Sequence, residues 1–123
     1  MHELSIAQSI VDAVETRATE CKATLVKSVR LRIGEANSIV PDSLTFCFDM
    51  LTSLDPMLAG AQLLIDNVPH RARCSHCAID FPVQNFVAQC PTCGKWSNDI
   101  ISGTELQILD MEIDVGEQQS CPK

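Results

Sequence analysis

Four of the seven cysteines form two Cys-x-x-Cys pairs, in the segments "RCSHC" and "QCPTCGKW". The pairs are Cys74 with Cys77 and Cys90 with Cys93, and twelve residues separate them. Two intervening residues allow both thiolates of a tight turn to reach one ion, and two such turns close a tetrahedral shell of four sulfurs. Because sulfur then takes every coordination position, no position remains for water or substrate. The spacing therefore predicts a structural zinc site rather than a hydrolytic one.

Other uses of these cysteines are less consistent with the chain. A rubredoxin-like iron centre would use the same four thiolates, but a redox role does not account for the remaining sequence. A thioredoxin-like dithiol needs one pair at the start of a helix, whereas here both pairs lie in one short segment. His76, inside the first pair, is a further candidate ligand, although a histidine in such a turn is more often solvated. Gly94 follows the second pair and supplies the positive-φ freedom that such turns often require.

The chain begins "MHELSIAQSI", so a histidine directly follows the initiator methionine. Methionine is usually retained before a large second residue, which would leave the α-amine of Met1 one residue from the His2 imidazole. An amine of unperturbed pKa ~7.7 to 8.0 and an imidazole of ~6.5 can both be neutral donors near pH 7. With the amide nitrogen of His2 they could chelate one ion, in a geometry that favours square-planar Ni(II) or Cu(II). The amide or carboxylate of Glu3 could add a donor. The alternative is a frayed terminal histidine without a role.

The first elements that would position these groups are a helix and a strand. Apolar residues recur at helical spacing from residue 4 to residue 14, and Ser5 with Gln8 fits a capping box, which predicts a helix over about residues 4–21. In "KSVRLRIG", Val29, Leu31 and Ile33 alternate with polar residues. This period predicts a half-buried strand that ends at Gly34.

A second helix and two further strands are predicted downstream. Pro41 stands where a helix would begin, with Leu44, Phe48 and Leu51 along one face. The segments "AQLLIDNV" and "LQILDMEIDV" both have strand character, and the second alternates apolar with acidic residues. Between them, residues 70–103 lose this periodicity and contain both cysteine pairs. The pattern predicts an α+β domain of two helices on a three-stranded sheet, formed by residues 1–69 and 104–116, with an inserted domain over 70–103.

The inserted segment is short for an independent domain. It has roughly 34 residues, below the ~40 at which a hydrophobic core alone usually suffices, so its fold should depend on the bound metal. Residues 117–123 are expected to form a tail.

The charge and hydropathy of the chain argue against nucleic-acid and membrane partners. The chain has 123 residues and a formal net charge of -7, and its nine Lys and Arg residues are spread along it. Phosphate binding requires clustered basic residues, so a nucleic-acid surface is disfavoured. No apolar run approaches the ~20 residues of a membrane span, and the N-terminus lacks the pattern of a signal peptide. We therefore expect a cytoplasmic protein without a membrane partner.

The remaining cysteines fit a reducing compartment. An odd total with two close pairs favours metal binding over disulfides. Cys21 and Cys47 fall within helical patterns and are best interpreted as small buried or half-buried hydrophobic residues. Cys121 lies in the tail. No functional role is assigned to these three cysteines, to His70 or to His76.

Several segments together resemble the HypA/HybF family of hydrogenase maturation nickel chaperones. They are, in order, "MHELSIAQSIV", "VRLRIGE", "VPDSLTFCF", the paired Cys-x-x-Cys turns and "ISGTELQILDMEID". The resemblance covers nearly the whole chain, and the Met-His-Glu start together with the paired turns is specific. It implies a small nickel-binding αβ domain into which a zinc ribbon is inserted.

The resemblance also implies ligands and partners. Nickel would be bound by His2, with the amine of Met1 and the backbone of Glu3 beside it, and zinc by the four paired cysteines. The chain would deliver Ni(II) to the large subunit of a [NiFe] hydrogenase together with a nickel-handling GTPase, and it would not be an enzyme. Some relatives have histidines directly after the cysteine pairs, where this chain has Ala78 and Gly94. The alternative function is a zinc-ribbon interaction scaffold without metal cargo, and a homodimer is left open.

Overall fold

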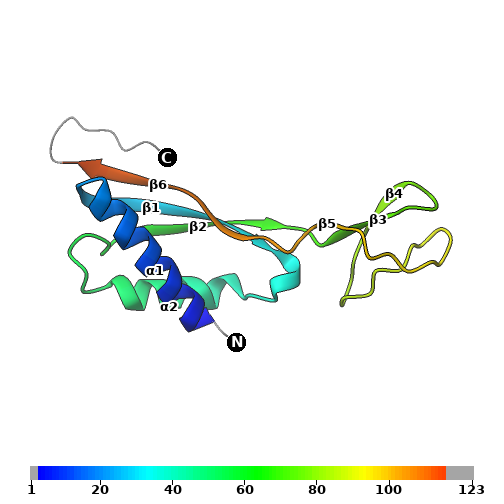
Figure 1. The fold of residues 1–123 in the computed structure, drawn as a ribbon. Helices are drawn as coiled ribbons and strands as arrows, with labels where there is room; N and C mark the ends of the chain where they lie inside the picture. Colours follow the sequence, from blue (N-terminus) through cyan, green and yellow to red (C-terminus); the bar gives the residue numbers. More distant parts are fainter. Residues whose placement is uncertain (1–2, 116–123) are drawn as a thin grey trace. The chain divides into compact units, whose positions relative to one another are not determined.

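The structure is a computed structural model, and it describes residues 3–115. It is an α+β fold, which confirms the predicted class. The elements are α1 (Glu3–Glu20), β1 (Ala23–Gly34), the short 3-10 helix η1 (Glu35–Asn37), α2 (Pro41–Thr52), β2 (Gln62–Val68), β3 (Arg71–Cys74), β4 (Ile79–Pro82), β5 (Ile100–Ser102) and β6 (Leu106–Val115), as Figure 1 shows.

The strands form two separate sheets of three strands each. The first has the order β2-β1-β6 and the second the order β4-β3-β5. The chain also divides into two compact units. The first unit comprises the residues through Leu31, Ile39–Asp66 and the residues from Ile108 onward, and the second comprises Arg32–Ser38 and Asn67–Gln107. The four-cysteine cluster and the cavity at His70, both described below, each lie within the second unit.

Helix α1 lies within one residue of the predicted bounds, but its predicted cap is wrong. The helix begins at Glu3, so Ser5 lies inside the first turn and cannot be its N-cap. The Gln8 side chain instead donates a hydrogen bond to Oδ1 of Asp12, at 3.0 Å. An i, i+4 contact on the helix surface has replaced the capping interaction because the helix starts two residues before Ser5.

The core of the first unit lies between the helices and the first sheet, and both helices cover one face of that sheet (Figure 1). Helix α1 buries its apolar stripe at every third or fourth residue, as predicted. Helix α2 begins at Pro41 and buries Leu44 and Phe48, each 0% exposed, while Leu51 is half-buried. Complete burial of such side chains contributes roughly 1.5–3 kcal/mol each. The amphipathic pattern therefore accounts for the packing of both helices.

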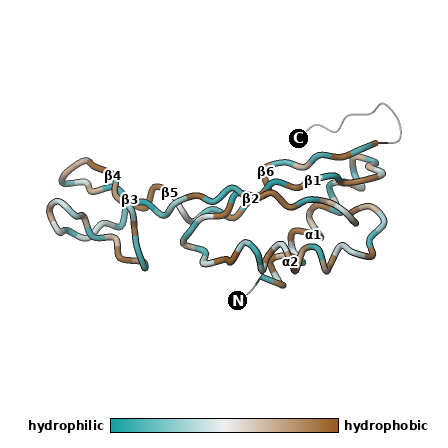
Figure 2. The backbone as a smooth tube through the Cα atoms, turned by 180° about the vertical axis from the view of Figure 1, so that it is seen from behind, coloured by the Kyte–Doolittle hydropathy of each residue, from teal (hydrophilic) through white to brown (hydrophobic). Residues whose placement is uncertain are grey.

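The central strand β1 follows its predicted alternation. Val29, Leu31 and Ile33 are buried, whereas Arg30 and Arg32 are exposed. Figure 2 shows hydrophilic and hydrophobic residues alternating along the strands of this sheet. The strand begins at Ala23, earlier than predicted, in a stretch whose sequence alternates less clearly. The strand β6 was also predicted; the alternating residues Leu109, Met111, Ile113 and Val115 are half-buried, whereas Leu106 and Ile108 are exposed.

The second unit contains strands that the sequence did not indicate. Strand β3 pairs antiparallel with β4, with Ala72 opposite Phe81 and Cys74 opposite Ile79. These strands have three or four residues each, too short for an alternation to be recognised. Their buried cluster is small, consisting of Ala72, Cys74, Phe81, Val83, Ala88 and Cys90. Two of the six members are candidate metal ligands, so the unit has little apolar core of its own.

Two glycines allow close backbone packing within the second unit. A Cβ on Gly34 would collide with the backbone of Gly103, and a Cβ on Gly103 would collide with the backbone of His70. The amide of Ala36 donates to the carbonyl of Gly103 at 2.8 Å. The segments around residues 34–36, 70 and 103 are therefore held in tight register.

The other cysteines of the described part differ in state. Cys47 is half-buried in α2 and free, as expected of a small apolar residue. Cys21 is buried, 7% exposed, one residue after the end of α1, but it is disulfide-bonded, so its interpretation as a small hydrophobic residue is incomplete. Cys121 lies outside the described residues. Within residues 3–115, neither helix is both long and apolar enough to cross a membrane.

Candidate metal centre

The two Cys-x-x-Cys segments form matching turns. The amide of Ala78 donates to the carbonyl of Cys74 at 2.7 Å, and the amide of Gly94 donates to the carbonyl of Cys90 at 2.8 Å. Both donors have positive φ, 58° for Ala78 and 76° for Gly94. The role expected for Gly94 is thus confirmed, and Ala78 adopts the same conformation at the cost of strain that glycine avoids.

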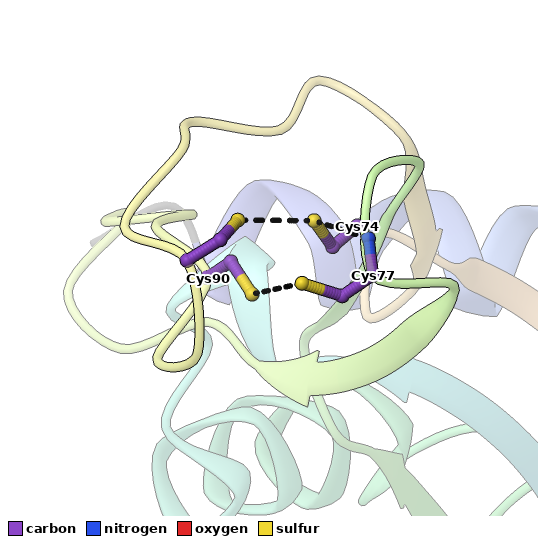
Figure 3. Close-up of side chains that lie close together, drawn as sticks. Cys74, Cys77 and Cys90 are labelled. Carbon is purple, nitrogen blue, oxygen red and sulfur yellow. Dashed lines mark hydrogen bonds between the residues drawn. The ribbon is translucent and has the colours of Figure 1, made fainter.

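The four sulfur atoms of these turns converge. The Sγ atoms of Cys74 and Cys93 are 3.6 Å apart, those of Cys77 and Cys90 are 4.0 Å apart, and all four lie within 4.8 Å of one another. In a tetrahedral centre with metal–sulfur bonds of ~2.3 Å, neighbouring sulfurs are about 3.8 Å apart. Figure 3 shows Cys74, Cys77 and Cys90 with their side chains directed toward a common centre. The sulfur spacing therefore fits a single tetrahedral ion.

The electrostatics of the cluster require a cation if all four thiols ionise. Backbone amides of Cys93 and Thr92 donate to the Cys90 sulfur and lower the pKa of its thiol to about 6. Burial and the neighbouring sulfurs of Cys93, Cys90 and Cys74 raise the pKa of Cys77 to about 12. One thiolate is thus stabilised by the backbone, but further thiolates beside it are not. A divalent ion among the sulfurs would remove this penalty, because it attracts every thiolate at once.

No other cluster of this kind is found in the described part of the chain. Among residues 3–115, no further group of three or more His, Cys, Asp or Glu side chains lies close enough to share an ion. His76 is exposed in the first turn and is not a member of the cluster. The structure therefore groups the four predicted cysteines and gives no support to a ligand exchange by His76.

The N-terminal candidate site is described only from Glu3. Met1 and His2 lie outside the described residues. Glu3 is the first residue of α1 and is 8% exposed. The amide of Val40 donates to its Oε2 atom at 3.2 Å, and Val40 is the N-cap of α2. The carboxylate of Glu3 thus joins the starts of the two helices within the first unit.

Sequence reasoning did not single out one buried histidine. His70 is 8% exposed in the second unit, and its amide donates to Oε1 of Glu35 at 2.8 Å. The pair is separated by 35 residues, and no periodicity connects them. The contact between His70 and Glu35 can therefore be recognised only in the three-dimensional structure.

The chain matches a known family over most of its length. The family model described as "Hydrogenase/urease nickel incorporation, metallochaperone, hypA" matches residues 1–113. A protein from Geobacter metallireducens named "Hydrogenase maturation factor HypA" is 40% identical over 114 residues, which are 93% of this chain and 100% of that protein. One of the same name from Streptomyces avermitilis is 43% identical over 118 residues, 94% of this chain and 89% of that protein.

Solved structures share the fold. The solution structure of the Ni metallochaperone HypA from Helicobacter pylori superimposes with a TM-score of 0.64 and 22% sequence identity. The match covers 94% of this chain and 99% of that one. A second solution structure of a HypA protein gives the same TM-score over 92% of this chain.

Proposed function

The chain belongs to the HypA family of hydrogenase and urease nickel-incorporation metallochaperones, and we propose that it carries Ni(II) to a [NiFe] hydrogenase during maturation. The observation that carries this proposal is the family match from residue 1, which includes the Met-His-Glu start. The proposed role is binding, transport and release of an ion, with no bond-making step and therefore no catalytic residue. We propose that nickel binding and delivery take place in the cytoplasm, where thiols remain reduced.

The proposed nickel ligands are the amine of Met1, the amide and imidazole nitrogens of His2, and the backbone amide of Glu3. The structure bears on the last of these. Because the Glu3 carboxylate already accepts a hydrogen bond from Val40 and is largely buried, it is a poorer candidate than the Glu3 backbone. A site made of terminal nitrogens suits a carrier, since few ligands must be released at transfer.

The proposed resident metal is zinc, bound by Cys74, Cys77, Cys90 and Cys93. Zinc accepts a tetrahedral set of four thiolates and has no redox chemistry, which suits a purely structural site. We propose accordingly that residues 70–103 form a zinc-ribbon domain inserted into a nickel-binding domain of residues 1–69 and 104–116. The ion contributes folding free energy to a segment whose own apolar cluster is small.

Metal stoichiometry tests this function against the scaffold alternative. Untagged protein beginning at Met1 is expected to bind one tightly held nickel ion per chain, which survives desalting, in addition to its zinc. The measurement is calorimetric titration with Ni(II), followed by elemental analysis of the desalted complex. The zinc content of the same sample is the internal control, because nickel that merely replaced zinc would lower it. If the desalted protein contains no nickel after titration with excess Ni(II), a zinc-ribbon scaffold that carries no cargo would be favoured.

The proposed partners are a nickel-handling maturation GTPase and the hydrogenase large subunit. Both purified partners, immobilised separately, are expected to bind the chain in a concentration-dependent and saturable manner. An unrelated acidic protein of similar size is the control, because a net charge of -7 can cause weak binding to any basic surface. If neither partner binds this chain more tightly than it binds the control, the partner assignment is wrong.

A further inference from the structure

The second compact unit has a cavity, open to solvent, that the four-cysteine cluster does not use. Its volume is about 370 Å³. The polar residues that line it are Glu35, Ser38, His70, Gln84 and Asn85, and Phe86 covers one side. All belong to the second unit. No Lys or Arg lines the cavity, so its charged groups are a carboxylate and, when protonated, an imidazole.

His70 is the buried polar residue of this cavity. It is 8% exposed, and its ring meets the ring of Phe86 edge to face, with centroids 5.9 Å apart. Within residues 3–115 no hydrogen-bond partner is found for its ring nitrogens, although its backbone groups are bonded. No nitrogen or oxygen atom of the described side chains is both sealed from solvent and unpaired. A ring nitrogen of His70 without a partner is therefore accessible to solvent, and His70 lines the cavity.

Glu35 places a carboxylate against the backbone of His70, and both residues line the cavity. Its Oε1 accepts the hydrogen bond from the His70 amide at 2.8 Å, so the carboxylate lies next to the residue that bears the ring. The close packing of Gly34, Gly103 and His70 holds this arrangement in place. In addition Ser38, Asn85 and Phe86 have positive φ of 56°, 52° and 63°. Such strained residues persist only where surrounding structure stabilises them.

The donor set of the cavity suits a divalent transition-metal ion. An imidazole nitrogen is a strong ligand for nickel, zinc and copper, and a carboxylate adds charge neutralisation. The hydroxyl of Ser38 and the amide oxygens of Gln84 and Asn85 are neutral oxygen donors at the rim, and water could complete the shell. Phosphate or another anion would fit poorly, because Glu35 would repel it and no basic side chain faces it.

We propose that this cavity is a second metal site, which binds a divalent transition ion such as Ni(II) through His70 and Glu35. With only two strong protein ligands it is weaker than the four-cysteine cluster and exchanges its ion readily. The site is independent of the proposed terminal nickel site, which lies in a different part of the chain, and each can fail without the other.

The test uses the full, zinc-loaded chain with an N-terminal extension, which removes the free amine. Ni(II) is added in steps while backbone amide signals are recorded by NMR. Nickel bound by nitrogen and oxygen ligands in six-coordinate geometry is paramagnetic and broadens nearby signals. Signals of residues 35–38, 70 and 83–86 are expected to broaden first. Affinity should fall about tenfold or more in His70→Phe and in Glu35→Gln, since even outer-shell groups change metal affinity on that scale.

The two variants and one control keep the result interpretable. His70→Phe retains a ring against Phe86, and Glu35→Gln retains an oxygen that can accept from the His70 amide, so one variant decides if the other fails to fold. His76→Ala removes an exposed histidine and should leave binding unchanged. The proposal is overturned if broadening occurs only near α1 or the cysteines, if both variants bind as tightly as the parent, or if equimolar Mg²⁺ abolishes the effect.

Discussion

Replacing Cys90 with serine is expected to abolish zinc binding and to unfold residues 70–103, while α1, α2 and the β2-β1-β6 sheet keep their structure. Serine offers a weakly acidic hydroxyl in place of the thiolate whose pKa the backbone lowers to about 6. The three remaining sulfurs would then be left crowded around an incomplete shell. Structural zinc contributes roughly 10–16 kcal/mol in comparable small domains, far more than the small apolar cluster here can replace.

The loss of zinc from Cys90→Ser is measured by the zinc content of the protein, and the unfolding by the dispersion of the amide NMR signals from residues 70–103. Cys47→Ser is the matched control, because Cys47 is a half-buried free cysteine of α2 outside the cluster. That control should retain zinc and all signals of the second unit. Stoichiometric zinc and an unchanged spectrum in Cys90→Ser would remove this residue from the ligand set.

Local patterns were sufficient to predict the elements of the first unit. The apolar stripe of α1, the start of α2 at Pro41 and the alternation in β1 all follow from side chains that one face buries. The cap was mispredicted because Ser5 and Gln8 match the capping pattern equally well inside a helix. Propensity alone could not decide where the first turn begins, since the Glu3 carboxylate accepts a tertiary hydrogen bond from the amide of Val40.

The second unit was less predictable because its short strands carry no period. The spacing of its cysteines nevertheless predicted which side chains come together, since chelation constrains residues at fixed separations. The cavity at His70 has no such signature. It depends on Glu35, on the turn around Asn85 and on the close approach of Gly103, which are distant in sequence and meet only in the folded chain.

The largest functional effect is expected at the first two residues. His2→Ala removes the only side-chain nitrogen proposed for the nickel site, and an extension ahead of Met1 converts its amine into a weakly donating amide. Either change should abolish tight nickel binding and leave the zinc untouched, because the four cysteines lie in a separate segment. Protons compete for the same nitrogens, so affinity should also fall as the pH drops through ~8 to 6, the range of their unperturbed pKa values.

Nickel calorimetry on three zinc-loaded proteins tests the proposal of a terminal carrier site most directly. They are the untagged chain, His2→Ala and the N-terminally extended form, each also carrying His70→Phe so that the cavity does not contribute. We expect one tight nickel ion per chain in the first protein and none in the other two, with equal zinc in all three. Equal nickel affinity in the three proteins would contradict a site at Met1 and His2 and would leave the scaffold function as the better account.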